Sequence, residues 1–351
     1  MTTMPLAARW IRSLALAGLV LCFTVVVLGA YVRLTTAGLG CPDWPGCYGH
    51  FKPPSRLEIA ENNQVFPDKP IDEGKAWREM IHRYAASTLG MICVALAVLA
   101  FATRRQRLVS LPLAWGLVAI IIFQGLLGML TVTWQVTPLV VTGHLLFGLT
   151  TLSLLWWLWL SLPGTGIRSS ATPPSTAAAQ SARTAWRLAL IGLIALIIQI
   201  ALGGWTSTNY ADIACPDFPK CQDAWWPQAD FRDAFVLWRG LGVNYEGGVL
   251  SIPARVAIHL THRMGAIVAT VTLIVAAVTV IRHKVSTTYV SPAYAVLIAL
   301  ALQLTIGITM VLRGFPLWLA TAHTAGAALL LLSVLALLRG AGATARARLI
   351  W

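Results

Sequence analysis

Two short stretches place ionisable side chains three residues apart, where a polar loop runs into an apolar segment. They are Glu79 and His82 in the first stretch, and His259 and His262 in the second. Residues three apart on a helix lie on one face, one turn from each other. Each stretch therefore directs two titratable groups the same way, at the edge of a segment that resembles a membrane span.

Two more histidines, His144 and His323, lie inside later apolar runs. Ionisable residues inside membrane spans are costly and are functional candidates by default. His82 pairs with His144 in one half of the chain, and His262 pairs with His323 in the other. Two imidazoles facing each other across a helical bundle can hold one haem iron from both axial sides. A lone histidine is more simply explained by a hydrogen bond to a backbone carbonyl, but four matched histidines favour ligation.

Zinc is the competing ligand. A closed zinc site needs about four ligands at one point. Each half offers two histidines plus Glu79 or His259, with no cysteine at that depth. We therefore favour haem over zinc or another non-haem metal.

Other residues near the histidines fit a bulky planar guest, and each also has a simpler explanation. Gln124 and Gln303 are buried polar groups that bond either a guest or a neighbouring helix. Arg83 and Arg263 pair either with haem propionates, which we favour, or with lipid headgroups. Small residues leave room between helices but are equally favoured in plain helix packing; here they are Gly125, Gly128, Gly148, Gly307 and Gly326.

The two halves differ where the first has Glu79 and the second has His259. A bundle that only binds haem needs no carboxylate one turn from an axial histidine. A carboxylate beside a reacting centre can act as a base or stabilise developing positive charge. The first half is thus interpreted as the reacting half, and the second as the half that retains a cofactor.

Four cysteines form two pairs, Cys41 with Cys47 and Cys215 with Cys221. Each pair brackets five residues that include two prolines, which turn the chain back on itself. The pairs lie in loops expected on the oxidising side of the membrane, where disulfides persist. Structural disulfides are favoured, and redox-active ones remain an alternative because exposed short-loop disulfides can be labile.

Composition identifies an integral membrane protein. Of 351 residues 57% are hydrophobic and 11% charged, and the mean hydropathy is +0.72, whereas soluble domains carry about a quarter charged residues. The net charge of +13 would suggest nucleic acid in a soluble protein, but here the charges lie between spans and no nucleic-acid partner is expected. Eight apolar runs approach the length of about 20 residues that crosses a bilayer: 13–33, 80–102, 111–133, 139–162, 187–208, 255–281, 292–312 and 317–338.

The charges predict the orientation. With the N-terminus inside, every acidic residue falls in or beside the outer segments 34–79 and 209–254. The positive-inside rule then places both termini in the cytoplasm, in the plasma (inner) membrane. The first run is too long for a signal peptide and has a counterpart in the fifth. The charged residues of the inner segments are all basic: Arg9, Arg12, Arg104, Arg105, Arg107, Arg168, Arg183, Arg187, Arg282, Lys284, Arg339, Arg346 and Arg348.

An internal repeat organises the spans. The cysteine pairs recur at an offset of 174 residues, the His-Arg pairs at 180, and the later Gln, Gly and His landmarks at 179. Each half has four spans, so the repeats are parallel and we expect a pseudo-twofold axis along the membrane normal. The predicted fold is all-α: eight transmembrane helices in two tandem four-helix bundles. Residues 1–162 form the first bundle, 163–186 a flexible cytoplasmic linker and 187–351 the second bundle.

At these residues the sequence resembles the haem A synthase (CtaA/Cox15) family over essentially its whole length. The matching motifs are Gly38-Leu39-Gly40-Cys41-Pro42-Asp43-Trp44-Pro45, Glu79-Met80-Ile81-His82-Arg83, Gly143-His144, His262-Arg263 and Ala322-His323. The resemblance implies oxidation of a methyl group of haem O to the formyl group of haem A. It implies haem b held by His262 and His323, substrate haem held by His82 and His144, and Glu79 as the essential carboxylate. It also implies a haem O synthase and terminal oxidase assembly proteins as partners; a homo-oligomer is a further expectation.

Three other functions remain open. A di-haem electron carrier linked to quinol needs the same four histidines, but Glu79, present in one half only, counts against it. A quinone-linked thiol oxidase would depend on the cysteines and not on the histidines. A transporter built of parallel repeats would place its charges nearer the membrane midplane and use broken helices, which are not evident here.

Overall fold

The computed structural model describes residues 6–53, 55, 58, 71–162, 176–282 and 287–346. Eight of its helices are long and apolar enough to cross a membrane. The all-helical class and the number of spans are therefore confirmed. These helices are α1 (Leu6–Leu34), α3 (Glu73–Ala102), α4 (Leu111–Thr133), α5 (Pro138–Ser161), α6 (Thr176–Thr208), α8 (Ile252–Arg282), α9 (Thr287–Leu312) and α10 (Leu317–Arg346). Shorter elements in the connections are η1 (Arg104–Gln106), η2 (Asp212–Ala214) and α7 (Phe231–Ala234).

Several helices extend beyond the predicted apolar runs, because a helix can continue into polar surroundings past the bilayer. The N-terminus of α3 lies at Glu73, where the Asp72 side chain caps it by accepting from the Lys75 N–H at 3.0 Å. Helix α6 begins at Thr176, inside the stretch 163–186 that was expected to form the linker. This stretch is rich in alanine, the best helix former. Residues 163–175 of that linker lie outside the described residues, as do Lys284, Arg348 and the middle of the first outer loop.

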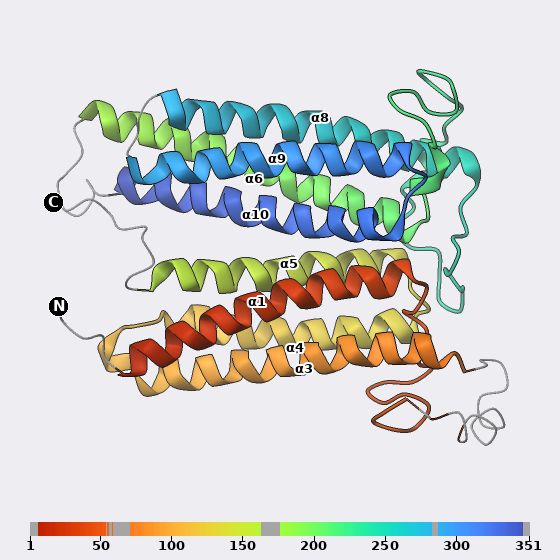
Figure 1. Ribbon diagram of the computed structural model, residues 1–351, viewed down its shortest axis with the longest axis horizontal. Helices are drawn as coiled ribbons and strands as arrows, with labels where there is room; N and C mark the ends of the chain where they lie inside the picture. Colours follow the sequence, from red (N-terminus) through yellow and green to blue (C-terminus); the bar gives the residue numbers. More distant parts are fainter. Residues whose placement is uncertain are drawn as a thin grey trace.

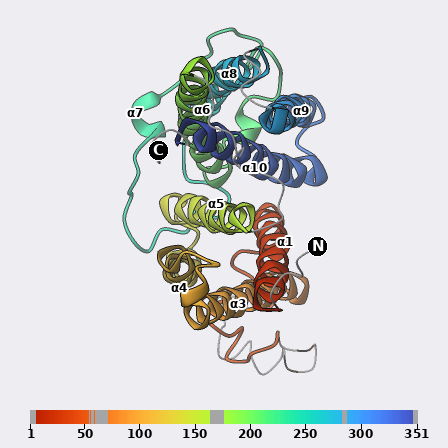
Figure 2. The same cartoon turned by 90° about the vertical axis from the view of Figure 1, so that its left-hand side faces the viewer.

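The long helices run nearly antiparallel and form two groups (Figure 1). Helices α1, α3, α4 and α5 pack against one another, and so do α6, α8, α9 and α10. The groups meet where α1 and α5 contact α10 and where α5 contacts α6, as the turned view in Figure 2 also shows. The start of α1 and the end of α10 lie at one end of the helices, and the loops that follow α1 and α6 lie at the other, which we call the loop end.

The largest cluster of buried apolar side chains includes Ile11, Leu96, Leu155 and Leu337, each at most 1% exposed. Burial near the loop end is uneven. Residues 320–327 of α10 are all half-buried there, whereas residues 256–260 of α8 are buried.

Candidate haem sites and the loops that cover them

Each of the four repeat-matched histidines lies against a glycine of the preceding long helix in its own half. A Cβ atom added to that glycine would lie between 2.9 Å and 3.5 Å from the histidine Cε1 atom. An alanine would therefore crowd the imidazole at Gly29, Gly203 and Gly307, and would make an ordinary contact at Gly128. The pairs are His82 with Gly29, His144 with Gly128, His262 with Gly203, and His323 with Gly307.

The structure brings the predicted histidine pairs together. All four histidines are half-buried, and within each half the imidazoles lie close enough to interact electrostatically, His82 with His144 and His262 with His323. Among the described residues no three His, Cys, Asp or Glu side chains are grouped as a metal site. The arrangement thus offers two histidines in each half rather than one closed multi-ligand cluster.

The glutamines bond the neighbouring helix. The side-chain nitrogens of Gln124 and Gln303 donate to the backbone carbonyls of His144 and His323, each at 3.0 Å. A third glutamine, Gln199, does the same to His262 at 3.0 Å. The sequence analysis missed Gln199, although its place four residues before Gly203 repeats the spacing of the other two glutamines from their glycines.

Polar atoms around the histidines are left without partners among the described residues. They are the Nδ1 atoms of His82, His144 and His323, and the Oε1 atoms of the three glutamines. Buried polar atoms in folded proteins normally have a hydrogen-bond partner, and each exception needs an explanation. Unpartnered imidazole nitrogens next to close-fitting glycines fit histidines that ligate a group carried between the helices.

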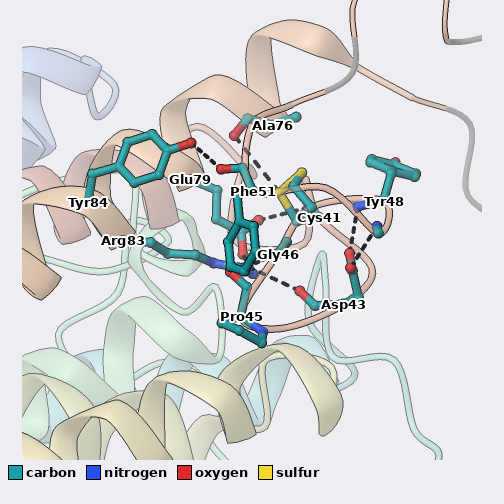
Figure 3. The surroundings of a disulfide bond; sticks show 12 residues. Cys41, Asp43, Pro45, Gly46, Tyr48, Phe51, Ala76, Glu79, Arg83 and Tyr84 are labelled. Atoms are coloured by element: carbon teal, nitrogen blue, oxygen red, sulfur yellow. Dashed lines mark hydrogen bonds and ion pairs between the residues drawn. A yellow bond between two sulfur atoms is a disulfide. The ribbon is translucent and has the colours of Figure 1, made fainter.

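Glu79 is only 4% exposed and both of its carboxylate oxygens have partners. Oε2 accepts from the backbone N–H of Cys41 at 2.9 Å, and Oε1 lies 2.5 Å from Nη2 of Arg83. Glu79 therefore connects α3 to the first disulfide loop (Figure 3). It precedes His82 by one helical turn. Its predicted chemical role stays a prediction.

Arg83 holds the first loop. Its Nη1 donates to the backbone carbonyls of Asp43 at 3.1 Å and Pro45 at 3.2 Å, and also to that of Gly46 (Figure 3). Together with the Glu79 ion pair, these bonds engage both terminal nitrogens of the guanidinium. The predicted propionate contact of Arg83 remains untested, and the structure adds a second role for it, as a clamp.

The second loop is fastened in the same way. Arg263 donates from Nη1 to the carbonyl of Lys220 at 2.7 Å, and from Nη2 to those of Asp217 at 2.7 Å and Cys215 at 3.2 Å. The difference lies in the partner one turn earlier on α8. His259 replaces the carboxylate there, and its Nδ1 lies 3.1 Å from the carbonyl oxygen of Ala211.

Inside each loop an aspartate closes the turn. Asp43 accepts from the Tyr48 N–H at 2.6 Å, and Asp217 accepts from the Gln222 N–H at 2.7 Å. The structure contains the expected disulfides, Cys41–Cys47 and Cys215–Cys221, and all four cysteines are at most 1% exposed. These matching hydrogen bonds support the inference of an internal repeat. Because the disulfides are buried, a reductant reaches them only when a loop opens.

The end of α6 and the segment that follows it also contact the first half. Arg33 donates to the carbonyl of Ser207 and lies over the ring of Tyr210, 4.2 Å from its centroid. Nearby, burial raises the pKa of the Asp212 carboxyl, against the opposing effects of the Ile213 N–H and the Arg33 charge. Asp212 lies beyond the end of α6, so this acidic group belongs to the junction of the two halves rather than to a span.

Residues 12–335 match the COX15-CtaA family, described as cytochrome oxidase assembly protein. The chain belongs to this family. The match contains all four histidines, both disulfide loops and Glu79, and it confirms the resemblance inferred from the motifs. A heme A synthase of Shewanella oneidensis is 43% identical over 317 residues, which are 90% of this chain and 92% of the relative. A heme A synthase of Rhizorhabdus wittichii is 27% identical over 350 residues, 93% of this chain and 92% of the relative.

Proposed function

We propose that this protein is a haem A synthase, a membrane oxidoreductase that converts a methyl group of haem O into the formyl group of haem A. One observation carries the proposal: a family match of nearly full length includes four histidines that each face a glycine across their own half of the helices. The eight candidate spans form two tandem four-helix bundles related by a pseudo-twofold axis along the membrane normal. The pairing of the helices and the matching loops support this arrangement.

The second half suits a resident haem b held by His262 and His323. Close-fitting glycines and an unpartnered His323 Nδ1 are the observations that fit an axial pair there. When bound, haem b supplies one-electron redox chemistry. The protein's part is to fix both imidazoles and to surround them with apolar helix surfaces.

The first half suits the substrate haem. His82 and His144 hold its iron, and the substrate methyl group lies toward Glu79, one turn from His82 on α3. The Arg83 guanidinium and the Cys41 N–H hold that carboxylate in place, where it can accept a proton released at the substrate carbon. In each of two steps an external oxidant removes two electrons and two protons while the methyl carbon gains a hydroxyl from water, which gives an alcohol and then a hydrated aldehyde; the hydrated aldehyde loses water to leave the formyl group.

Charge and family description suggest the cellular setting. Basic residues at the helix ends opposite the disulfide loops support an orientation with both chain termini in the cytoplasm and the loops on the oxidising side. A haem O synthase would supply the substrate, and assembly proteins of a terminal oxidase would receive haem A. The family description, cytochrome oxidase assembly protein, supports this place in haem supply.

The test is haem extraction and chromatography from membranes that contain this protein together with a haem O synthase. We expect haem A with the wild type and accumulation of haem O with Glu79→Gln, which keeps an acceptor for the Cys41 N–H. Glu73→Gln, in the first turn of the same helix, is the matched control and should still give haem A.

Haem b content of each purified variant shows that the fold is intact. Bound haem b in the wild type without any haem A, despite available haem O, would overturn the proposal and favour the di-haem electron carrier. Full haem A production by Glu79→Gln would remove Glu79 from the chemistry.

A further inference from the structure

Three of the four glycines that face a histidine follow a glutamine by four residues. The glutamine therefore lies one turn away on the same helix face. In all three cases its amide nitrogen donates to the backbone carbonyl of the facing histidine at 3.0 Å. The three units are Gln124 with Gly128, Gln199 with Gly203, and Gln303 with Gly307.

The fourth unit lacks the amide. Gly29 faces His82, and the residue four positions before it is Val25, at the place that Gln199 occupies in the other half. Valine offers no hydrogen bond, and Nδ1 of His82 has no partner among the described residues. His82 is thus the one repeat-matched histidine without a glutamine beside it.

A second difference separates the halves at the imidazole rings. Gln199 Nε2 lies 3.0 Å from Nδ1 of His262, and Gln303 Nε2 lies 3.3 Å from Nε2 of His323. In the first half Gln124 bonds only the backbone of His144, whose Nδ1 has no partner among the described residues. Both rings of the second half therefore touch an amide, and neither ring of the first half does.

This contact suits a permanent ligand. An imidazole that binds iron through one nitrogen carries a proton on the other, and a hydrogen bond to that N–H fixes the ring and raises its basicity. The Oε1 atoms of Gln199 and Gln303 have no other partner among the described residues. When the histidine is a ligand and the facing ring nitrogen carries a proton, the amide tilts so that Oε1 accepts from the ring N–H while Nε2 keeps its bond to the histidine carbonyl.

We infer that Gln199 and Gln303 are positioning residues that retain a haem in the second half, and that Val25 leaves His82 able to release its haem. The inference rests on the proposed function, in which the second half keeps its cofactor while the first takes up haem O and gives up haem A. The two halves would then differ in haem exchange although all four histidines face a glycine.

The first experiment measures how fast haem b leaves the purified full-length protein for an excess of apomyoglobin. Loss of a group that orients a metal ligand typically weakens metal binding about 10–100-fold. We therefore expect Gln199→Val to accelerate haem loss at least ~10-fold, by analogy with that range. Ile198→Val, at an exposed position next to it, should leave the rate unchanged.

A second readout separates positioning from general loosening. Removing a hydrogen bond from the imidazole lowers its basicity, so the midpoint potential of the retained haem should rise in Gln199→Val. The potential of Ile198→Val should match that of the wild type. Equal haem loss and equal potential in the two variants would overturn the role of Gln199.

The opposite substitution, which adds a glutamine to the first half, tests the role of Val25. Val25→Gln should supply the missing amide, so that more haem O and haem A stay with the protein through purification from membranes that make haem O. Thr24→Gln, on the exposed face of the same helix, is the control and should match the wild type. Unchanged haem O and haem A in Val25→Gln would overturn the role of Val25. A wild type that holds no haem would instead overturn the proposed function itself.

Discussion

Replacing Arg83 with methionine should let the first disulfide loop open about 100 times more often, because the change removes two sets of interactions. The guanidinium donates to three backbone carbonyls of the loop, among them those of Asp43 and Pro45. It also pairs with Glu79, which is 4% exposed and would keep only backbone N–H groups, including that of Cys41, as partners.

The expected size follows from these contacts. Hydrogen bonds that involve a charged group contribute about 1.5–3 kcal/mol. We take about 1.5 kcal/mol for the bonds to the loop carbonyls and about 1.5 kcal/mol for leaving the Glu79 carboxylate without its cation. The sum of about 3 kcal/mol corresponds to a factor of about 100 in the opening equilibrium.

Reduction of Cys41–Cys47 by dithiothreitol reports this opening, because both sulfur-bearing residues are 0% exposed. The rate is read from the gel shift after labelling with a large maleimide. A background of Cys215→Ser and Cys221→Ser leaves one loop disulfide to report. The two free cysteines, Cys22 and Cys93, are buried in spans and are present in every variant.

Arg263→Met is the matched control, measured on the second loop in a background of Cys41→Ser and Cys47→Ser. Arg263 also donates to loop carbonyls but has no carboxylate partner one turn earlier, where His259 stands. Its loop should therefore open only about 10 times more often. In the first loop, Glu79→Gln combined with Arg83→Met should return the rate to about this level. Equal effects of the two arginine variants, or no effect of either, would refute the reasoning.

Two further outcomes are expected. Gly307→Ala should weaken haem b binding about tenfold in a haem titration, because its Cβ would lie 2.9 Å from Cε1 of His323 and overpacking costs about 1–3 kcal/mol; Gly128→Ala, at 3.5 Å, should bind normally. The buried Asp212 has a raised pKa, so it should stabilise the fold below about pH 4 and lose that contribution as the pH rises through its raised pKa. Asp212→Asn should flatten this dependence of the melting temperature, and an unchanged pH profile would contradict it.

The repeat made much of the architecture predictable. Apolar runs near 20 residues identified eight spans, and prolines between paired cysteines correctly indicated closed loops. The start of α6 at Thr176 was missed because apolar runs report the bilayer and not the helix. An alanine-rich segment can remain helical beyond the membrane through its intrinsic propensity.

The contacts of the site were harder to predict. Arg83 was assigned to a propionate or a headgroup, since the sequence does not show that the loop folds its carbonyls back over α3. Gln199 was missed because the comparison of the halves looked for identical residues, and position 25 is valine. A comparison restricted to residues that both halves share could therefore not find Gln199, which distinguishes them.

The loop between α6 and α8 has a consequence for how the chain is made. Its Tyr245 N–H bonds the carbonyl of Gln135, and its Trp238 ring packs edge-on against Trp134, at 5.4 Å between centroids. Gln135 and Trp134 both lie just after α4, in the half that is synthesised first. The loop thus reaches a surface that already exists when it emerges, since N-terminal segments fold first during synthesis. Although the halves repeat each other, their order in the chain is not interchangeable: a second half made alone or made first would present Trp238 and Tyr245 with nothing to bind.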